Sequence, residues 1–400
     1  MLIKLLPLLM LALPAAATLA AQDVEAQFTT DKTEYLAGEP LFITLTVTNK
    51  GNAPIWIDFK FSDAPKLCEN FSLEVPGAEP PVHWGCGYAG SCVSGFKEIQ
   101  PSKSIAVRRL LNQQFLLRQI GEYAIRAQTN LVVHNQDLFD SPPTEQFEVT
   151  DTLKINLQRS NESQLKAAFE PFVEGLSSPD MMKRNEAATA ITALAPPFLE
   201  GVLIEMTKTN YASAAIVALR EADTQKTREA LGSIASGGGD SALRIKAISN
   251  LGRTGDRTYL YTLTRLLASE DKAIQNAAAE AAGVLGGPAA FAQIAALVPS
   301  SDASTRAAGA EGLGHTRTRQ AVPILIQMLL DSDPNVRQAA VNSLSLLTHR
   351  VAYYGDEWSD VTNESSANDV HQRWARWWNS HGDASKIYGL TDCARPDSLE

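Results

Sequence analysis

Apolar positions follow two different periods along the 400-residue chain, and the period changes near residue 163. In the first third, apolar residues alternate with polar ones, as where Ile43, Leu45 and Val47 alternate with threonines. About seven such strands, separated by turns, predict a β-sandwich over residues 23–158. From Leu165 onward, apolar residues recur with the period of amphipathic helices.

The helical part, residues 163–350, consists of about six similar units. The units can be registered on Arg184, Ala212, Arg244, Gln275, Arg306 and Arg337, at steps of 28, 32, 31, 31 and 31 residues. A small residue stands three positions after each of these, and Ile or Leu stands seven positions after five of them. A fixed period in this range predicts an α-solenoid of stacked helix pairs, an architecture that typically binds partners.

An aspartate precedes the register position by four residues in five of the six units. These residues are Asp180, Asp240, Asp271, Asp302 and Asp333. Carboxylates at such regular spacing could serve as calcium ligands, but their constant phase instead predicts N-caps of the second helix of each unit. We therefore expect no metal site in the solenoid.

If the solenoid binds a partner, the second helices should line the binding face. The exposed positions there are one and five residues after the register position, and the polar candidates are Asn185, Asn276, Glu280, Glu311, Gln338 and Asn342. This mixture does not resemble a phosphate-binding groove, and a face that is merely solvated would look the same.

Residues 351–400 form the expected C-terminal cap and tail. Trp374, Trp377 and Trp378 fall on one helical face, and Gly382 is suited to end that helix. Terminal units of solenoids must cover an open apolar face, so these tryptophans are predicted to be a structural cap. Stacking on sugars is the alternative.

Residues 1–21 have the pattern of a secretory signal peptide. Lys4 provides the positive region, residues 5–13 the apolar core, and the alanines of 15–21 the small residues for cleavage. The apolar run is too short to span a membrane, and no cysteine lies near the cleavage site for lipid attachment. We expect a periplasmic or secreted protein with no membrane anchor after cleavage.

The cysteines fit an oxidising compartment. Three of them crowd one insertion of the first domain and one lies near the end: Cys68, Cys86, Cys92 and Cys393. All four are disulfide candidates, and four cysteines allow three connectivities. Cys92 could instead act as a nucleophile with His83 or His134, but its neighbours match no protease signature.

The charge and the remaining motifs exclude several classes of function. A formal net charge of −10 is unsuited to nucleic acid, and no polybasic segment is present for anionic lipid. No C-x2-C pair or other ligand spacing indicates a metal or cofactor, and no acid, base and nucleophile assemble into a catalytic set. We expect a protein that is not an enzyme and has no cofactor.

Two segments of the first domain resemble immunoglobulin-like domains of exported bacterial proteins. They are DKTEYLAGEPLFITLTVTNKGNAPIWI, from Asp31, and GEYAIRA, from Gly121. The second is similar to the tyrosine corner, which implies that the Tyr123 hydroxyl contacts nearby backbone. Bacterial intracellular proteinase inhibitors share this kind of sandwich, so an inhibitor acting through the β-sandwich is one alternative function.

The helical units resemble the short HEAT-like repeats of the phycobilin lyase type. DPNVRQAAVNSL, from Asp333, and DSALRIKAISNLG, from Asp240, carry the resemblance, and the Trp-rich end resembles those of other exported bacterial HEAT-like proteins. The family includes bilin lyases and the iron-dependent deoxyhypusine hydroxylase, whose His-Glu pairs are missing here. The resemblance implies an exported scaffold that binds a protein partner through the solenoid, with a lyase-like enzyme as the alternative.

Overall fold

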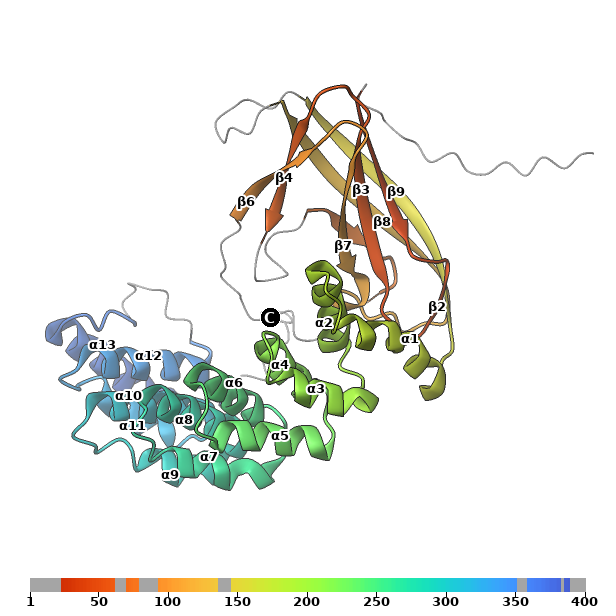
Figure 1. Ribbon diagram of the computed structural model, residues 1–400. Helices are drawn as coiled ribbons and strands as arrows, with labels where there is room; N and C mark the ends of the chain where they lie inside the picture. The colour runs from red at the N-terminus through yellow and green to blue at the C-terminus, as the bar shows by residue number, and fades with distance from the viewer. Residues whose placement is uncertain are drawn as a thin grey trace, which may run out of the picture. The chain divides into compact units, whose positions relative to one another are not determined.

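The computed structural model describes residues 23–61, 70–78, 93–135, 145–350, 358–382 and 385–388. The predicted signal peptide and the disulfide candidates Cys68, Cys86, Cys92 and Cys393 lie outside these residues. Contacts between Cα atoms divide the chain into two compact units, Met1–Phe169 and Glu170–Glu400. Strands make up most of the first unit and helices make up the second (Figure 1).

The first unit contains two β-sheets. Its strands are β1 (Val24–Thr30), β2 (Glu34–Leu36), β3 (Phe42–Asn49), β4 (Ile55–Phe61), β5 (Ser72–Glu74), β6 (Val93–Ile99), β7 (Ser104–Leu110), β8 (Gly121–His134) and β9 (Glu145–Gln158). One sheet has the order β1-β3-β7, and the other has the order β2-β9-β8-β4-β6, with β5 paired to β8. Only the short β2 pairs in parallel, with β9, among the described strand pairs.

Side chains from both sheets share one hydrophobic core. In β3, Ile43, Leu45 and Val47 are fully buried, as their alternation with threonine predicts. Ile57 from β4 and Ile125 from β8 reach the same core from the other sheet. The period-2 pattern therefore identifies the buried face of these strands correctly.

Tyr123, near the start of β8, ties the preceding turn to this core. Its ring is buried, and its hydroxyl oxygen accepts a hydrogen bond from the main-chain amide of Gln119 at 2.9 Å. The predicted contact between this hydroxyl and nearby backbone is confirmed.

The helices of the described residues are between five and 18 residues long. They are α1 (Glu162–Gly175), α2 (Met181–Leu194), α3 (Glu200–Met206), α4 (Ala212–Ala222), α5 (Gln225–Ser236), α6 (Ser241–Gly252), α7 (Leu260–Leu266), α8 (Lys272–Gly286), α9 (Phe291–Ala295), α10 (Ala303–His315), α11 (Ala321–Met328), α12 (Pro334–Thr348) and α13 (Glu364–His381). Short 3-10 turns precede α3, α7 and α9. The even-numbered helices α2 to α12 carry the register positions, and each packs against the next in the order α2, α4, α6, α8, α10, α12 (Figure 1).

The five regularly spaced aspartates are N-caps. Main-chain amides of the first helical turn donate to the carboxylates of Asp180, Asp240, Asp271, Asp302 and Asp333, which confirms the prediction. Two caps also bind the preceding unit: Ser241 donates to Asp271 at 2.6 Å, and Lys272 lies 2.8 Å from a carboxylate oxygen of Asp302. The Lys272 contact, with a further hydrogen bond from Thr305, holds the pKa of Asp302 well below its usual range.

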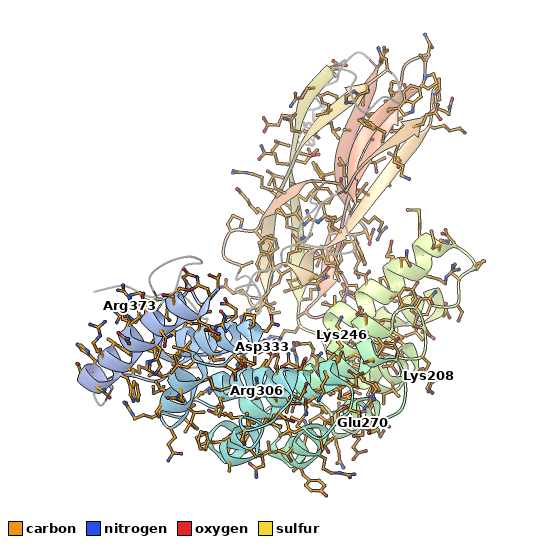
Figure 2. The ribbon with its side chains drawn as sticks, turned by 90° about the vertical axis from the view of Figure 1, so that its left-hand side faces the viewer. Lys208, Lys246, Glu270, Arg306, Asp333 and Arg373 are labelled. Atoms are coloured by element: carbon orange, nitrogen blue, oxygen red, sulfur yellow. The ribbon has the colours of Figure 1, made fainter. Side chains whose placement is uncertain are left out.

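The register side chains reach back to the end of the preceding helix, a role that the repeat pattern did not reveal. Donors on Arg184, Arg244, Gln275, Arg306 and Arg337 bind the main-chain oxygens of Ser178, Ala235, Leu267, Ser300 and Asp331 respectively. The oxygens of Ala235 and Leu267 belong to the ends of α5 and α7, where carbonyls lack an intrahelical partner, and the oxygens of Ser178, Ser300 and Asp331 lie in the turn that follows the preceding helix. Arg306, labelled in Figure 2, also forms a bidentate ion pair with Asp331, with both N–O distances 2.7 Å.

Small residues allow the even-numbered helices to approach each other closely. The predicted seam positions Ala278 and Ala340 are fully buried. Several glycines leave even less space: a Cβ atom on Gly252 would lie 2.7 Å from the Cα of Ala281 in α8. A Cβ atom on Gly283 would overlap the carbonyl oxygen of Gly312 in α10. The backbones of α6, α8 and α10 are therefore nearly in contact.

Candidate functional site

The candidate site lies on the even-numbered helices, where the six polar positions fall. Asn185 on α2 and Asn342 on α12 are exposed, whereas Asn276 and Glu280 on α8, Glu311 on α10 and Gln338 on α12 are half-buried. The outer candidates are satisfied within the chain. Asn185 accepts from the Tyr211 hydroxyl at 2.8 Å, and the Gln338 amide donates to Asn342 at 3.0 Å.

The three central candidates, Asn276, Glu280 and Glu311, differ from the outer ones in their hydrogen bonding. The Oδ1 atom of Asn276 is buried and has no hydrogen-bond partner among the described residues. Neither Glu280 nor Glu311 forms a hydrogen bond or an ion pair with any part of the chain that the structure describes. The Asn276 oxygen is shut off from water, and one such acceptor left without a donor costs about 1–3 kcal/mol, whereas the carboxylate oxygens of Glu280 and Glu311 remain open to water.

Close helix packing brings two further polar residues to this place. Gly252 packs on Ala281, the residue that follows Glu280 in α8. Arg253 is the next residue after Gly252, so it lies near Glu280. At the end of α10, the Cβ atom of His315 would lie 2.9 Å from a Cβ atom on Gly283. We call Arg253, Asn276, Glu280, Glu311 and His315 the central polar cluster.

Burial dominates the electrostatics of the central polar cluster. It raises the pKa of Glu280, an effect opposed by the charge of Arg253 and reinforced by the charge of Glu311. It also lowers the pKa of His315 to about 4, with smaller contributions from Arg253 and Arg317. His315 is therefore neutral at physiological pH, and its Nδ1 atom has no hydrogen-bond partner in the described chain.

Arg253 and His315 were not among the residues that the sequence analysis selected. Both stand nine residues after a register position, Arg244 and Arg306 respectively. Positions one, five and nine follow each other at the four-residue spacing of one helix face. Extending the pattern by one more step would have found both residues.

The predicted cap tryptophans occupy different environments. Trp374 is fully buried, and its indole nitrogen donates to the Trp358 main-chain oxygen at 3.2 Å. Trp377 and Trp378 are half-buried. The guanidinium carbon of Arg350 lies 4.1 Å from the ring centre of Trp358 and 5.2 Å from that of Trp377, in cation–π contact.

The tail is also bound to the last helix pair. Arg319, just before α11, places its guanidinium carbon 5.4 Å from the Trp378 ring. Arg337 on α12 donates from Nε to the main-chain oxygen of Val361 at 3.0 Å, and α13 contacts α11. Arg319 and Arg350, which flank the last helix pair in sequence, thus contact Trp378 and Trp377, rings on which a sugar would have to stack.

An apolar groove beside α11 is a weaker candidate. Pro323, Ile324 and Met328 line it, and Leu330 at its edge is 40% exposed. Its one charged residue, Asp331, is already paired with Arg306. No helix within the described residues is long and apolar enough to cross a membrane.

The family model for HEAT repeats matches residues 228–298 and 292–354, which shows that α6 to α12 are HEAT repeats. No curated protein matches the chain.

Three solved structures illustrate the structural likeness. The complex of CpcE and CpcF of phycocyanin lyase from Nostoc is 20% identical over 44% of this chain and 76% of that one, with a TM-score of 0.33. Human deoxyhypusine hydroxylase is 17% identical over 46% and 75%, with a TM-score of 0.27. Salmonella alpha-2-macroglobulin is 12% identical over 88% of this chain but 27% of its own, with a TM-score of 0.18. Likeness at this level does not extend to activity or partners.

Proposed function

Because residues 228–354 form HEAT repeats, we propose that this protein is a non-catalytic scaffold that binds a protein partner through the face of α6 to α12. The carrying observation is the central polar cluster, whose half-buried acceptors have no donor within the described chain. The carboxylates of Glu280 and Glu311 are open to water and make no hydrogen bond or ion pair within the described chain, so they are available to a partner on this face.

The enzymatic alternative has less support in the geometry. A perturbed pKa, such as that of Glu280, also occurs at catalytic sites. Catalysis by His315 or Glu280 would need a second group oriented by a hydrogen bond, and neither side chain forms one with a described residue. We therefore place the cluster in recognition rather than in proton transfer.

We further propose export to the periplasm or the medium. Its support is the leader pattern of residues 1–21 and the concentration of cysteines in one insertion. Mass spectrometry of the cell-derived protein should give a mature N-terminus between Ala21 and Asp23, whereas an intact Met1 would overturn the proposal. Thiol labelling of the unreduced protein should leave at least two of Cys68, Cys86 and Cys92 unmodified.

We also assign the first unit to the immunoglobulin-like sandwiches. The support is its two sheets with a shared core and the hydrogen bond from Gln119 to the Tyr123 hydroxyl. The inhibitor alternative would place the function in this unit. It predicts that residues 23–158 alone inhibit a protease.

Site-specific photo-crosslinking tests the binding face. A photoreactive residue at Gln338 or Glu311 should capture a partner from the exported fraction, while one at Tyr261 on α7, which is 70% exposed, should not. Capture of the same partner with equal yield from Tyr261, or from neither position on the face, would refute binding through the even-numbered helices.

A further inference from the structure

We propose that Met181 and Met182 form an oxidant-accepting site at the start of α2, where hydroperoxides convert both thioethers to sulfoxides while the chain stays folded. This site lies outside the face of α6 to α12, so the proposal is independent of the scaffold function.

The four methionines of the described residues fall into two exposure classes. Met181 and Met182 are 63% and 69% exposed, whereas Met206 in α3 and Met328 in α11 are only 3% and 5% exposed. The exposed pair belongs to an unbroken run of exposed residues, 179–183. A dissolved oxidant therefore reaches these two side chains directly, but it reaches the buried two only when the structure opens.

Neither packing nor the repeat pattern accounts for methionine at these two positions. They are the first two residues after the Asp180 N-cap, and neither is buried. The equivalent pairs in the other capped units contain small, polar or charged residues or proline, namely Ser241 and Ala242, Lys272 and Ala273, Ala303 and Ser304, and Pro334 and Asn335. What distinguishes the first unit is therefore the reactivity of two adjacent thioethers in water.

The local structure does not depend on the two side chains. The Asp180 carboxylate caps α2 by accepting from the main-chain amide of Met182 at 2.8 Å. Arg184 holds the preceding turn through the main-chain oxygen of Ser178. The buried face of α2 begins only at Ala187, so conversion of the thioethers to polar sulfoxides removes no contact from the core.

The reaction transfers one oxygen atom to each sulfur. A sulfur lone pair attacks one oxygen of hydrogen peroxide, an S–O bond forms and the O–O bond breaks. The sulfur is oxidised by two electrons, and the second peroxide oxygen is reduced and leaves with both protons as water. Alkyl hydroperoxides react in the same way, with an alcohol as the leaving group.

Trypsin separates the two exposure classes into different peptides. Peptide 167–183 contains both exposed methionines, 185–208 contains Met206 and 320–337 contains Met328. The full chain is treated with dilute hydrogen peroxide, quenched at intervals, digested and analysed by mass spectrometry. Peptide 167–183 should gain two oxygen atoms at least about tenfold faster than either other peptide gains one. In denaturing urea, all three should oxidise at similar rates per methionine, because the folded structure sets the difference.

A second measurement tests whether the pair reacts without damage to the fold. Peptide 167–183 of the variant Met181→Leu/Met182→Leu should take up no oxygen. In the matched control Met206→Leu/Met328→Leu, a swap that cores tolerate, this peptide should oxidise at the wild-type rate. Urea unfolding of the oxidised wild type should have the same midpoint as that of Met181→Leu/Met182→Leu after the same treatment. This variant keeps all the cysteines, so the comparison isolates the methionines.

Two outcomes would overturn the proposal. One is oxidation of peptide 185–208 or 320–337 as fast as that of 167–183 in the folded chain. The other is a lower unfolding midpoint for the oxidised wild type than for the equally treated Met181→Leu/Met182→Leu variant, which would show that the two thioethers are packed.

Discussion

A close backbone approach between α8 and α10 provides the sharpest test of the helical packing. A Cβ atom on Gly312 would lie 2.8 Å from Ile294 Cγ2, 2.9 Å from the carbonyl oxygen of Ala279 and 3.0 Å from its carbonyl carbon. Ordinary carbon contacts lie at about 3.5–4.0 Å, so the two helices would have to separate. Overpacking costs about 1–3 kcal/mol, and the better helix propensity of alanine returns about 1 kcal/mol. The net effect of Gly312→Ala is therefore a loss of up to about 2 kcal/mol in the free energy of unfolding.

Gly201 in α3 is the matched control, because no atom lies within 4 Å of the place its Cβ would occupy. Gly201→Ala should raise stability by up to about 1 kcal/mol through helix propensity alone. Urea unfolding followed by the helical circular dichroism signal measures both variants, provided that the denaturant slope is unchanged. A Gly312→Ala protein at least as stable as the wild type would refute the close packing of α8 on α10.

The remaining predictions concern the cap, an N-cap and the buried histidine. Trp374→Ala should destabilise the helical unit by about 3–5 kcal/mol, and truncation after Arg350 should promote aggregation; a truncated protein that melts like the full chain would contradict the cap. Asp333→Ala should cost about 1 kcal/mol in thermal or urea unfolding, whereas Asp333→Asn should cost little, because asparagine also caps helices. Between pH 6.5 and about 4 the unfolded chain binds a proton at His315 that the folded chain does not. The wild type should therefore lose about 3 kcal/mol relative to His315→Gln as pH falls through this window, and parallel pH–stability curves would show that His315 titrates normally.

Local features of the helical unit were readable from the sequence. The aspartates form hydrogen bonds within their own helical turn, so a constant phase was enough to identify them as caps. A small residue that recurs at a fixed position of the repeat indicates a contact between helices. Ala278 and Ala340 occupy this position, and both are fully buried, as predicted.

Features that depend on contacts between elements were not readable. The carbonyl that Arg306 binds is set by the path of the preceding turn, which the repeat pattern does not specify. The central polar cluster depends on how far α6, α8 and α10 overlap, and Gly252 and Gly283 determine that overlap. The register positions alone place His315 on the helix face, but they do not show that it meets α8 at Gly283.

In the first unit, the alternation in β3 predicted its buried face. The strands β8 and β9, however, are longer than the segments of the sequence from which they were predicted. In the sequence, Tyr123, Ile125 and Ala127 share one face and the apolar residues from Phe147 to Leu157 share another, whereas the strands run over Gly121–His134 and Glu145–Gln158. In β8, buried positions continue to alternate through Thr129, Leu131 and Val133, and β9 pairs along this whole length.

Arg337 forms hydrogen bonds both with the turn before α12 and with the tail after it, and this limits where a repeat can be added or lost. Its guanidinium binds backward to the oxygen of Asp331, as the other register side chains do, and forward to the oxygens of Val361 and Thr362. Through the contacts with Val361 and Thr362, α12 binds the tail and not another repeat. Duplication or deletion of a unit in the middle of the array would preserve equivalent contacts on both sides, whereas a unit added after α12 would displace the tail. Copy number in such an array can therefore vary in its interior while its C-terminal end stays fixed.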